Sequence, residues 1–156
     1  MTEKSFQEQY PDDFSHCYGC GRLNADGLHV KSYWDGEESV CTFEPDPRHK
    51  AFPGFVYGGL IASVIDCHST GTAAAAAYRR EGRDFGTDPP LRYVTASLHV
   101  DYLRPTPMGP PLVLRSRVTE FKERKIVVET DLSAGGELCA RGKLVAVKMP
   151  DTMMVK

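Results

Sequence analysis

One long apolar segment stands out in the pattern of hydrophobic and polar positions along the chain. It runs from about Gly58 to Arg80, is dominated by aliphatic residues and alanine, and is followed by Gly82. A run of this length with a glycine just beyond it is typical of an α-helix. Its second half, 72–77, is almost all alanine, and such small side chains let another backbone come close. The pattern therefore predicts one long helix that is buried against a sheet.

Shorter segments with alternating apolar and polar residues indicate β-strands on both sides of this helix. Two of them flank the dipeptide Asp35-Gly36, which is a strong signal for a hairpin turn. The predicted strands are Leu28–Trp34, Glu38–Phe43, Arg92–Leu103, Leu112–Phe121, Lys125–Leu132 and Leu138–Val147. Long strands joined by hairpins favour an antiparallel sheet. We expect an α+β domain over residues 16–149, with a flexible N-terminal arm at 1–15 and a tail at 150–156.

Composition and charge exclude several classes of partner. The 156 residues carry a net charge of −2 and contain no basic block, so nucleic acid is not an expected partner. No apolar run approaches the roughly 20 residues that span a bilayer, and the polar N-terminus does not resemble a signal peptide. The five cysteines are an odd number, and no Asn-X-Ser/Thr site is present. We therefore expect a cytoplasmic protein with reduced thiols.

Candidate chemistry gathers at the start of the predicted helix. Pro53 and Gly54 favour a turn, and Gly58 and Gly59 then leave the first helical amides uncovered by side chains. These amides lack partners within the helix, so together with the helix dipole they favour negative charge or a polarised carbonyl. Asp66 follows in an otherwise apolar run, where a carboxylate is costly unless it is paired, solvated or used.

A Cys-X-X-Cys pair, Cys17 and Cys20, precedes the domain core, with His16 beside it. Such a pair is found in zinc and redox sites, but a zinc site needs four ligands and no second pair follows. We expect these residues to pack in a turn, and we expect no metal site. Cys67, beside Asp66, is expected to act as a small buried hydrophobe.

Three stretches together resemble the hotdog fold, and more narrowly the PaaI-like acyl-CoA thioesterases of the phenylacetate pathway. They are Phe52–Gly59, Asp66 on the helix, and Val94–Pro105, preceded by the Cys-X-X-Cys-Gly opening. The resemblance implies a long central helix wrapped by a curved antiparallel sheet of five or six strands. It also implies hydrolysis of an acyl- or aryl-acyl-CoA, with no cofactor other than the coenzyme A of the substrate.

The resemblance also implies residue roles. Gly59, with Gly58 beside it, becomes the donor to the thioester oxygen, Asp66 the general base or nucleophile, and Thr95 the auxiliary hydroxyl. Tyr57 departs from the family pattern, where histidine is usual, and a phenol is a poor acid or base near neutrality. Candidate contacts to the phosphates of coenzyme A are the cations Arg104, Lys122 and Arg124.

Helix geometry adds a constraint on these roles. Asp66 lies seven residues after Gly59, roughly 10 Å along a helix that rises about 1.5 Å per residue. Reacting groups must approach within about 3–3.5 Å, so one thioester carbon cannot easily meet both residues of one helix. Two antiparallel helices would bring Gly59 of one chain to Asp66 of the other. We therefore expect a homodimer with two shared sites, or a homotetramer built as a dimer of dimers.

Other polar residues have simpler interpretations. His68 is turned about 200° around the helix from Asp66 and is expected to be packed or hydrogen-bonded rather than catalytic. Ser69 and Thr70 do not form a Ser-His-Asp arrangement, because no strained elbow such as Gly-X-Ser-X-Gly accompanies them. On the strand 92–103, strict alternation puts Thr95, His99 and Asp101 on one face, which suggests an interface or a site wall.

Two other functions remain open. The replacement of the usual histidine by Tyr57 fits a non-catalytic acyl-CoA-binding protein. The sequence His49-Lys50-Ala51-Phe52-Pro53-Gly54, followed by Asp66, resembles faintly the hotdog 3-hydroxyacyl thioester dehydratases, which carry His-Phe-Pro-Gly and a helical glutamate.

Overall fold

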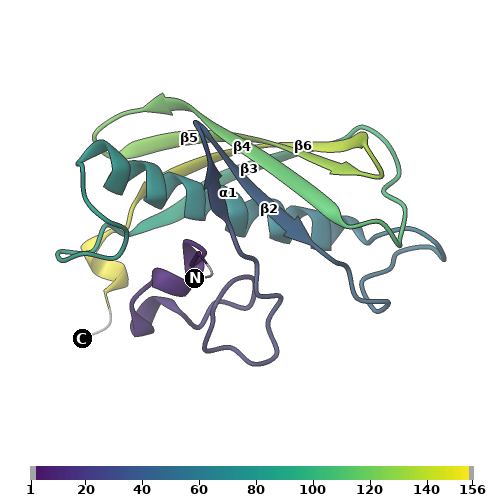
Figure 1. The fold of residues 1–156 in the computed structure, drawn as a ribbon, viewed down its shortest axis with the longest axis horizontal. Helices are drawn as coiled ribbons and strands as arrows, with labels where there is room; N and C mark the ends of the chain where they lie inside the picture. The colour runs from purple at the N-terminus through teal and green to yellow at the C-terminus, as the bar shows by residue number, and fades with distance from the viewer. Residues whose placement is uncertain (1–2, 155–156) are drawn as a thin grey trace.

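The protein consists of one long helix packed against a six-stranded antiparallel sheet, in a computed structural model that describes residues 3–154 (Figure 1). Helix α1 spans Gly58–Arg80. The strands are β1 Tyr33–Asp35, β2 Glu38–Phe43, β3 Tyr93–Tyr102, β4 Leu112–Phe121, β5 Lys125–Ala134 and β6 Glu137–Lys148. Their order across the sheet is β1-β2-β4-β5-β6-β3, and every neighbouring pair is antiparallel. The chain has the hotdog fold that its sequence predicted.

Short 3₁₀ helices lie near both ends of the chain: η1 Gln7–Gln9, η2 Asp12–Phe14 and η3 Asp151–Met153. The outermost parts of the expected arm and tail, residues 1–2 and 155–156, lie outside the described residues. Over residues 3–154, no helix is both long and apolar enough to cross a lipid bilayer.

The predicted bounds of α1 are confirmed at both ends. Tyr57 precedes the helix in an extended conformation and gives no side-chain cap, while Gly82 adopts a positive φ of 67° just beyond the end. That left-handed conformation favours glycine and stops a helix. The alanines Ala73, Ala74 and Ala77 are buried, as their size predicted, against a cluster of sheet residues: Tyr93, Ile126, Val128, Leu144 and Ala146.

The first strand is shorter than predicted, and the chain before it explains why. β1 begins only at Tyr33, although alternation starts at Leu28. The amide of Leu28 donates to the Tyr18 carbonyl and that of Val30 to the Gly19 carbonyl, at 2.8 and 3.0 Å. These amides are therefore used by the preceding loop and are not available to β2.

A β-bulge in β3 corrects the face assignment made from strict alternation. The pairing with β6 shifts between Thr95 and Ser97, which inserts one extra residue. Thr95 therefore lies on the helix side, where its hydroxyl reaches Asp66. His99 and Asp101, which alternation placed with Thr95, are exposed and pair with each other at 3.0 Å. The bulge thus separates the helix-facing threonine from the outward-facing pair.

The N-terminal arm was expected to be flexible, but from Ser5 onward it packs on the core. Phe6 and Tyr10 are buried. Both rings contact Phe85 from the loop after α1, with centroids 5.8 and 5.6 Å away, and Phe85 also contacts Tyr78 of the helix at 4.8 Å. Aromatic side chains bury a large area in such contacts, so the arm, the loop and the helix end form one packed unit.

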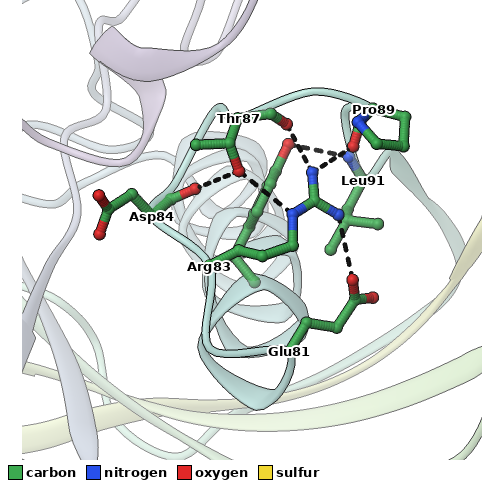
Figure 2. A network of polar contacts seen from close by, with 7 residues as sticks. Glu81, Arg83, Asp84, Thr87, Pro89 and Leu91 are labelled. Atoms are coloured by element: carbon green, nitrogen blue, oxygen red, sulfur yellow. Dashed lines mark hydrogen bonds and ion pairs between the residues drawn. The ribbon is translucent and has the colours of Figure 1, made fainter.

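The loop between α1 and β3 is organised around the guanidinium of Arg83, as Figure 2 shows. Arg83 Nη1 donates to Glu81 at 3.1 Å, and Nη2 donates to the carbonyls of Thr87, at 2.6 Å, and Pro89. The amide of Leu91 donates to the Tyr78 hydroxyl at 2.8 Å. The guanidinium of Arg83 therefore donates to backbone carbonyls of the loop, which have no strand partner.

A buried polar network joins the arm, the sheet and α1 at His68. The ring is fully buried, with Nδ1 2.7 Å from Ser32 Oγ and Nε2 3.3 Å from Ser39 Oγ. Gln7 donates to Ser32 Oγ at 2.9 Å and accepts from its amide at 2.8 Å. Thr72 lies 2.6 Å from Ser39. His68 is therefore a hydrogen-bonded core residue, as the sequence predicted.

Burial of His68 makes the stability of the fold sensitive to acid. Desolvation lowers the pKa of His68 from 6.5 to about 3, and the side chains that hydrogen-bond to the ring are the uncharged hydroxyls of Ser32 and Ser39. The unfolded chain binds a proton below about pH 6.5, whereas the folded chain does not until about pH 3, so stability falls as pH falls through this window. Between pH 7 and pH 5 we expect the free energy of unfolding to drop by about 2 kcal/mol.

Urea unfolding at several pH values measures this loss. The control is His68→Gln, which keeps hydrogen-bonding capacity but does not titrate. The variant should show a shallower loss than the wild type, and equal slopes for the two proteins would contradict the assignment.

Candidate active site

The carboxylate of Asp66 is held by the hydroxyl of Thr95, and the hydroxyl of Thr70 lies beside the pair. Asp66 lies in the middle of α1 and is half-buried. Thr95 Oγ1, on β3, donates to Asp66 Oδ1 at 2.6 Å, and Thr70 Oγ1 lies 2.9 Å from Thr95 Oγ1 and 3.4 Å from Oδ1. Among the described residues, Oδ2 has no hydrogen-bond partner. One oxygen is therefore anchored, and the other is available to water or substrate.

Thr70 lies beside Asp66, although it was not among the site residues expected from the sequence. It follows Asp66 by four residues, so the two share one face of the helix. That spacing was the signal that could have identified it. Its hydroxyl also donates to the Asp66 carbonyl at 2.9 Å, which fixes its rotamer. Thr70 therefore supports Thr95 and the carboxylate as part of one polar group.

Asp66, Thr70 and Thr95 line a cleft of about 300 Å³ between the helix, the arm and the start of β3. The remaining lining comes from the arm and from neighbours of the two threonines: Tyr10, Asp13, Phe14, His16, Cys17, Cys20, Cys67, Tyr93 and Val94. Its volume is at the lower end of small-molecule sites, about 300–1,000 Å³. Because the arm supplies much of the wall, residues outside the helix and sheet help to define the cleft.

The first turn of α1 presents backbone donors that the chain itself does not use. The carbonyl of Tyr57 accepts the amides of Leu60 and Ile61, at 3.1 and 3.2 Å. For the amides of Gly58 and Gly59, no acceptor is found in the part of the chain that the structure describes. Two free N–H groups at the positive end of a 23-residue helix can stabilise an oxyanion or a polarised carbonyl.

Two tyrosines surround these glycines. The Tyr102 hydroxyl, at the end of β3, donates to the Gly58 carbonyl at 2.8 Å. The exposed Tyr57 ring folds along the helix toward Gly59, where an added Cβ would lie only 2.4 Å from it. Gly59 therefore has no room for a side chain while Tyr57 keeps this position.

Within one chain, the amides of Gly58 and Gly59 and the carboxylate of Asp66 lie at separate sites. The cleft that Asp66 lines does not include Gly58, Gly59 or Tyr57. Their separation along the helix, roughly 10 Å at about 1.5 Å per residue, agrees with this. The structure thus brings Asp66 and Thr95 together, but it does not bring either of them to the glycines of the same chain.

The three candidate cations do not gather in one place either. Arg104 follows the end of β3, on the side of Gly58, and pairs with Glu137 at 3.2 Å. Lys122 and Arg124 lie in the β4–β5 turn, at the opposite end of the sheet. At that end Lys125 of β5 pairs with Val147 of β6, and the next residue of β6, Lys148, pairs with Tyr93 at the start of β3. The ten residues of β3 separate the two ends by about 30 Å, at about 3.3 Å per residue.

His49, considered for the dehydratase alternative, is occupied in its own turn. Its Nδ1 accepts the amide of Asp46 at 2.9 Å, and its carbonyl accepts the amide of Tyr57 at 2.8 Å. A histidine that accepts a backbone amide in this way is less available as a catalytic base. Through its carbonyl, His49 holds Tyr57, the residue that precedes α1.

Three thiols that were expected to be packing residues meet in the cleft wall. The sulfurs of Cys17, Cys20 and Cys67 lie within 4.8 Å of one another, and those of Cys17 and Cys67 are 3.9 Å apart. Hydrogen bonds from the thiols of Cys20 and Cys67 lower the pKa of Cys17, and donation to Cys17 raises the pKa of the other two. The spacing of Cys17 and Cys20 was visible in the sequence, but no sequence pattern indicated that Cys67 would lie next to them.

Large apolar side chains are exposed around the start of α1. They are Phe52, Phe55, Tyr57, Tyr102 and Leu103, and exposure reaches 77% at Phe52. The two segments that carry them are joined by hydrogen bonds from the Val56 amide to Thr106 and from the Met108 amide to Gly54. Strand β3 beside them lies at the edge of the sheet and, within residues 3–154, pairs only with β6. Such an apolar surface beside an open strand edge is typical of a protein–protein interface.

Comparison with known sequences gives a family and a set of relatives. The sequence profile described as the thioesterase superfamily matches residues 53–140. An acyl-coenzyme A thioesterase THEM4 of Xenopus laevis is 39% identical over 87 residues, which are 56% of this chain and 33% of that protein. The corresponding rat protein is 32% identical over 63% of this chain and 36% of its own length. The chain thus spans about a third of the length of these relatives.

Solved structures share the fold over most of the chain. A thioesterase superfamily protein from Shewanella loihica is 53% identical, covers 89% of this chain and 98% of its own, and superposes with a TM-score of 0.69. The Escherichia coli PaaI protein of the phenylacetic acid degradation operon is 15% identical, with a TM-score of 0.64 over 79% of this chain and 81% of its own. At that identity the second likeness concerns the fold alone.

Proposed function

Because the chain belongs to the thioesterase superfamily, we propose that it hydrolyses the thioester bond of an acyl- or aryl-acyl-coenzyme A in the cytoplasm. The observation that carries the proposal is the Asp66 carboxylate, anchored by Thr95 at 2.6 Å on one oxygen and lining a cleft. The names of the curated relatives support an acyl-CoA substrate. In this proposal the reaction needs no metal or redox cofactor, since coenzyme A arrives as part of the substrate.

The proposed chemistry divides the work between Asp66 and the first turn of α1. Asp66 either removes a proton from the attacking water or attacks the carbonyl carbon itself and forms a mixed anhydride, which water then opens. In both routes an oxygen–carbon bond forms, the carbon–sulfur bond breaks, and coenzyme A leaves as a thiol after it gains a proton. Negative charge on the carbonyl oxygen is met by the Gly59 amide, with Gly58 beside it. Such a donor is typically worth about 3–4 kcal/mol.

These two groups require two chains in the proposed site. Gly59 and Asp66 of one chain do not share a cleft, and the apolar surface and open β3 edge beside Gly58 fit a self-complementary contact. We therefore place the Gly59 amide of one protomer next to Asp66 of its partner in a homodimer. Two such dimers would make a homotetramer built as a dimer of dimers.

Tyr57 and the cations have secondary parts in this proposal. Tyr57 occupies the position of the usual histidine, and its ring lies against Gly59. We assign it to the shape of the entrance rather than to proton transfer, because a phenol is a poor acid or base near neutrality. Arg104 lies at the Gly59 end and is the preferred contact for a phosphate of coenzyme A. Lys122 and Arg124 lie at the far end of their own chain.

A thiol-release assay over short, medium, long and aromatic acyl-CoAs tests the proposed function. We expect free coenzyme A from at least one class, and no release from that substrate with Asp66→Asn. Tight ligand binding without thiol release across the panel would instead identify an acyl-CoA-binding protein. Adding a 3-hydroxyacyl and an enoyl thioester separates the dehydratase, which changes the double bond without releasing thiol.

A further inference from the structure

We propose that Cys17, Cys20 and Cys67 form a binding site for a thiophilic divalent metal ion, Zn²⁺, in the wall of the cleft. The site joins two segments that are far apart in the sequence, the loop that carries Cys17 and Cys20 and the middle of α1. Thiolates are soft ligands that favour zinc over harder cations such as magnesium. The proposal departs from the expectation of no metal site, because that expectation rested on a single Cys-X-X-Cys pair.

The spacing of the sulfurs fits tetrahedral coordination. Zinc–sulfur bonds of about 2.3 Å place two sulfurs of a tetrahedron about 3.8 Å apart. Cys17 Sγ and Cys67 Sγ are 3.9 Å apart, and all three sulfurs lie within 4.8 Å of one another. An ion placed between them would need a shift of only about 0.1 Å along the first edge and at most about 1 Å along the others. The thiols are thus already gathered around one point.

The backbone around Cys17 supports a ligand sulfur. The amide of Gly19 donates to Cys17 Sγ at 3.3 Å, and such N–H donors orient a metal ligand and stabilise its negative charge. Gly19 also allows the close approach of the helix, because a Cβ at this position would lie 2.2 Å from Cys67 Sγ. Any other residue at position 19 would push the third sulfur away.

The loop that carries two of the ligands is held by its own backbone hydrogen bonds. The Gly21 amide donates to the Cys17 carbonyl at 2.8 Å, and the amides of Leu28 and Val30 donate to the Tyr18 and Gly19 carbonyls. Cys67 is fixed by α1. A site on elements that are already held in place loses little entropy when it binds an ion, which favours affinity.

The fourth position of the ion would face the cleft. Residues 3–154 supply three ligand atoms within reach of one another and no fourth. Cys17 is exposed and lines the cleft, so water completes the tetrahedron from that side. We assign the ion a structural part: it ties the loop that carries Cys17 and Cys20 to α1, one residue from Asp66, and so fixes the wall of the cleft. This inference does not rest on the proposed hydrolysis.

Metal analysis of the purified full-length protein tests the site. After exposure to zinc and gel filtration under reducing conditions, we expect about one ion per chain. Cys17→Ser changes an exposed residue and should lose most of the bound zinc. The matched control is Cys139→Ala, which removes a buried cysteine of β6 outside the cluster and should keep it. Gly19→Ala leaves all five cysteines in place but should also reduce zinc binding.

Cobalt substitution of the wild type gives a result that does not depend on the folding of any variant. We expect intense visible absorption from tetrahedral Co²⁺ together with sulfur-to-metal charge transfer in the near ultraviolet. Less than a tenth of an ion per chain, or zinc retained equally by Cys17→Ser, would overturn the proposal. So would an air-purified protein that binds no zinc and lacks two titratable thiols, since that result assigns the cluster to a disulfide.

Discussion

Asp66→Asn is expected to lower kcat for the best acyl-CoA substrate by about 10²- to 10⁴-fold, the usual range for a lost general acid or base. The physical reason is the loss of charge at Oδ2, the oxygen with no partner among the described residues. Folding should survive, because an asparagine Oδ1 still accepts the hydrogen bond that Thr95 now gives at 2.6 Å. Steady-state thiol release, measured with purified protein of unchanged melting temperature, checks the result.

Thr95→Val and Thr70→Val show whether the carboxylate needs its hydroxyl partners. Removing Thr95 takes away the 2.6 Å donor and should cost more activity than removing Thr70, which lies 3.4 Å from Oδ1. A single charge-assisted hydrogen bond is worth about 1.5–3 kcal/mol, so the loss should reach roughly 10- to 100-fold for Thr95. If Asp66→Asn retained more activity than Thr95→Val, Asp66 would not be the reacting group.

Gly59→Pro is expected to reduce kcat by about 10²- to 10³-fold relative to Gly59→Ala, the typical effect of removing one oxyanion donor. Proline deletes the amide in the first helical turn, where that amide has no intrahelical partner and proline is tolerated. Both variants carry a Cβ that meets the Tyr57 ring, at 2.4 Å before it moves. Their comparison therefore cancels the Cβ contact and leaves the N–H group and the proline ring as the differences. Equal rates for the two would exclude the Gly59 amide as the donor.

Mixing the two inactive chains tests whether the sites are shared. Gly59→Pro and Asp66→Asn protomers are unfolded together and refolded as a mixture. Each heterodimer should regain one site with an intact amide and an intact carboxylate, whereas each homodimer lacks one group in both sites. Random pairing gives about half heterodimers, so activity should return to about a quarter of the wild-type value. A mixture as inactive as its components would refute shared sites.

Local features of the sequence were enough to predict much of this architecture. The helix bounds, the hairpin at Asp35-Gly36 and strand β4 are confirmed, because periodicity and turn-forming residues act over a few neighbouring positions. The buried state of His68 also followed from its position on the helix, about 200° from Asp66. The candidate roles of Asp66 and Gly59 came from the resemblance to a family and remain proposals.

The face of a strand on which a residue lies, and the partner to which a segment bonds, could not be predicted from the local pattern. A shift of a single residue is enough to change the face. The bulge in β3 inserts a single position and so moves Thr95 to the helix side, next to Asp66. Strict alternation has a period of two and cannot indicate such an insertion. Likewise, the early part of the segment before β1 bonds to the Cys17–Gly21 loop instead of β2, a choice between two partners that its own residues do not reveal.

The sequence by itself determined which segments become helix and strand, that the helix is buried against the sheet, and which residues at its start could carry chemistry. Periodic burial and backbone preference fix these properties within a few residues. Only the tertiary structure decided that the arm packs against Phe85, that Thr95 anchors Asp66, and that Cys67 meets a Cys-X-X-Cys pair fifty residues away. Those contacts form between segments that are far apart in the sequence, and a pattern over a few neighbouring residues does not specify which distant segment a residue will contact.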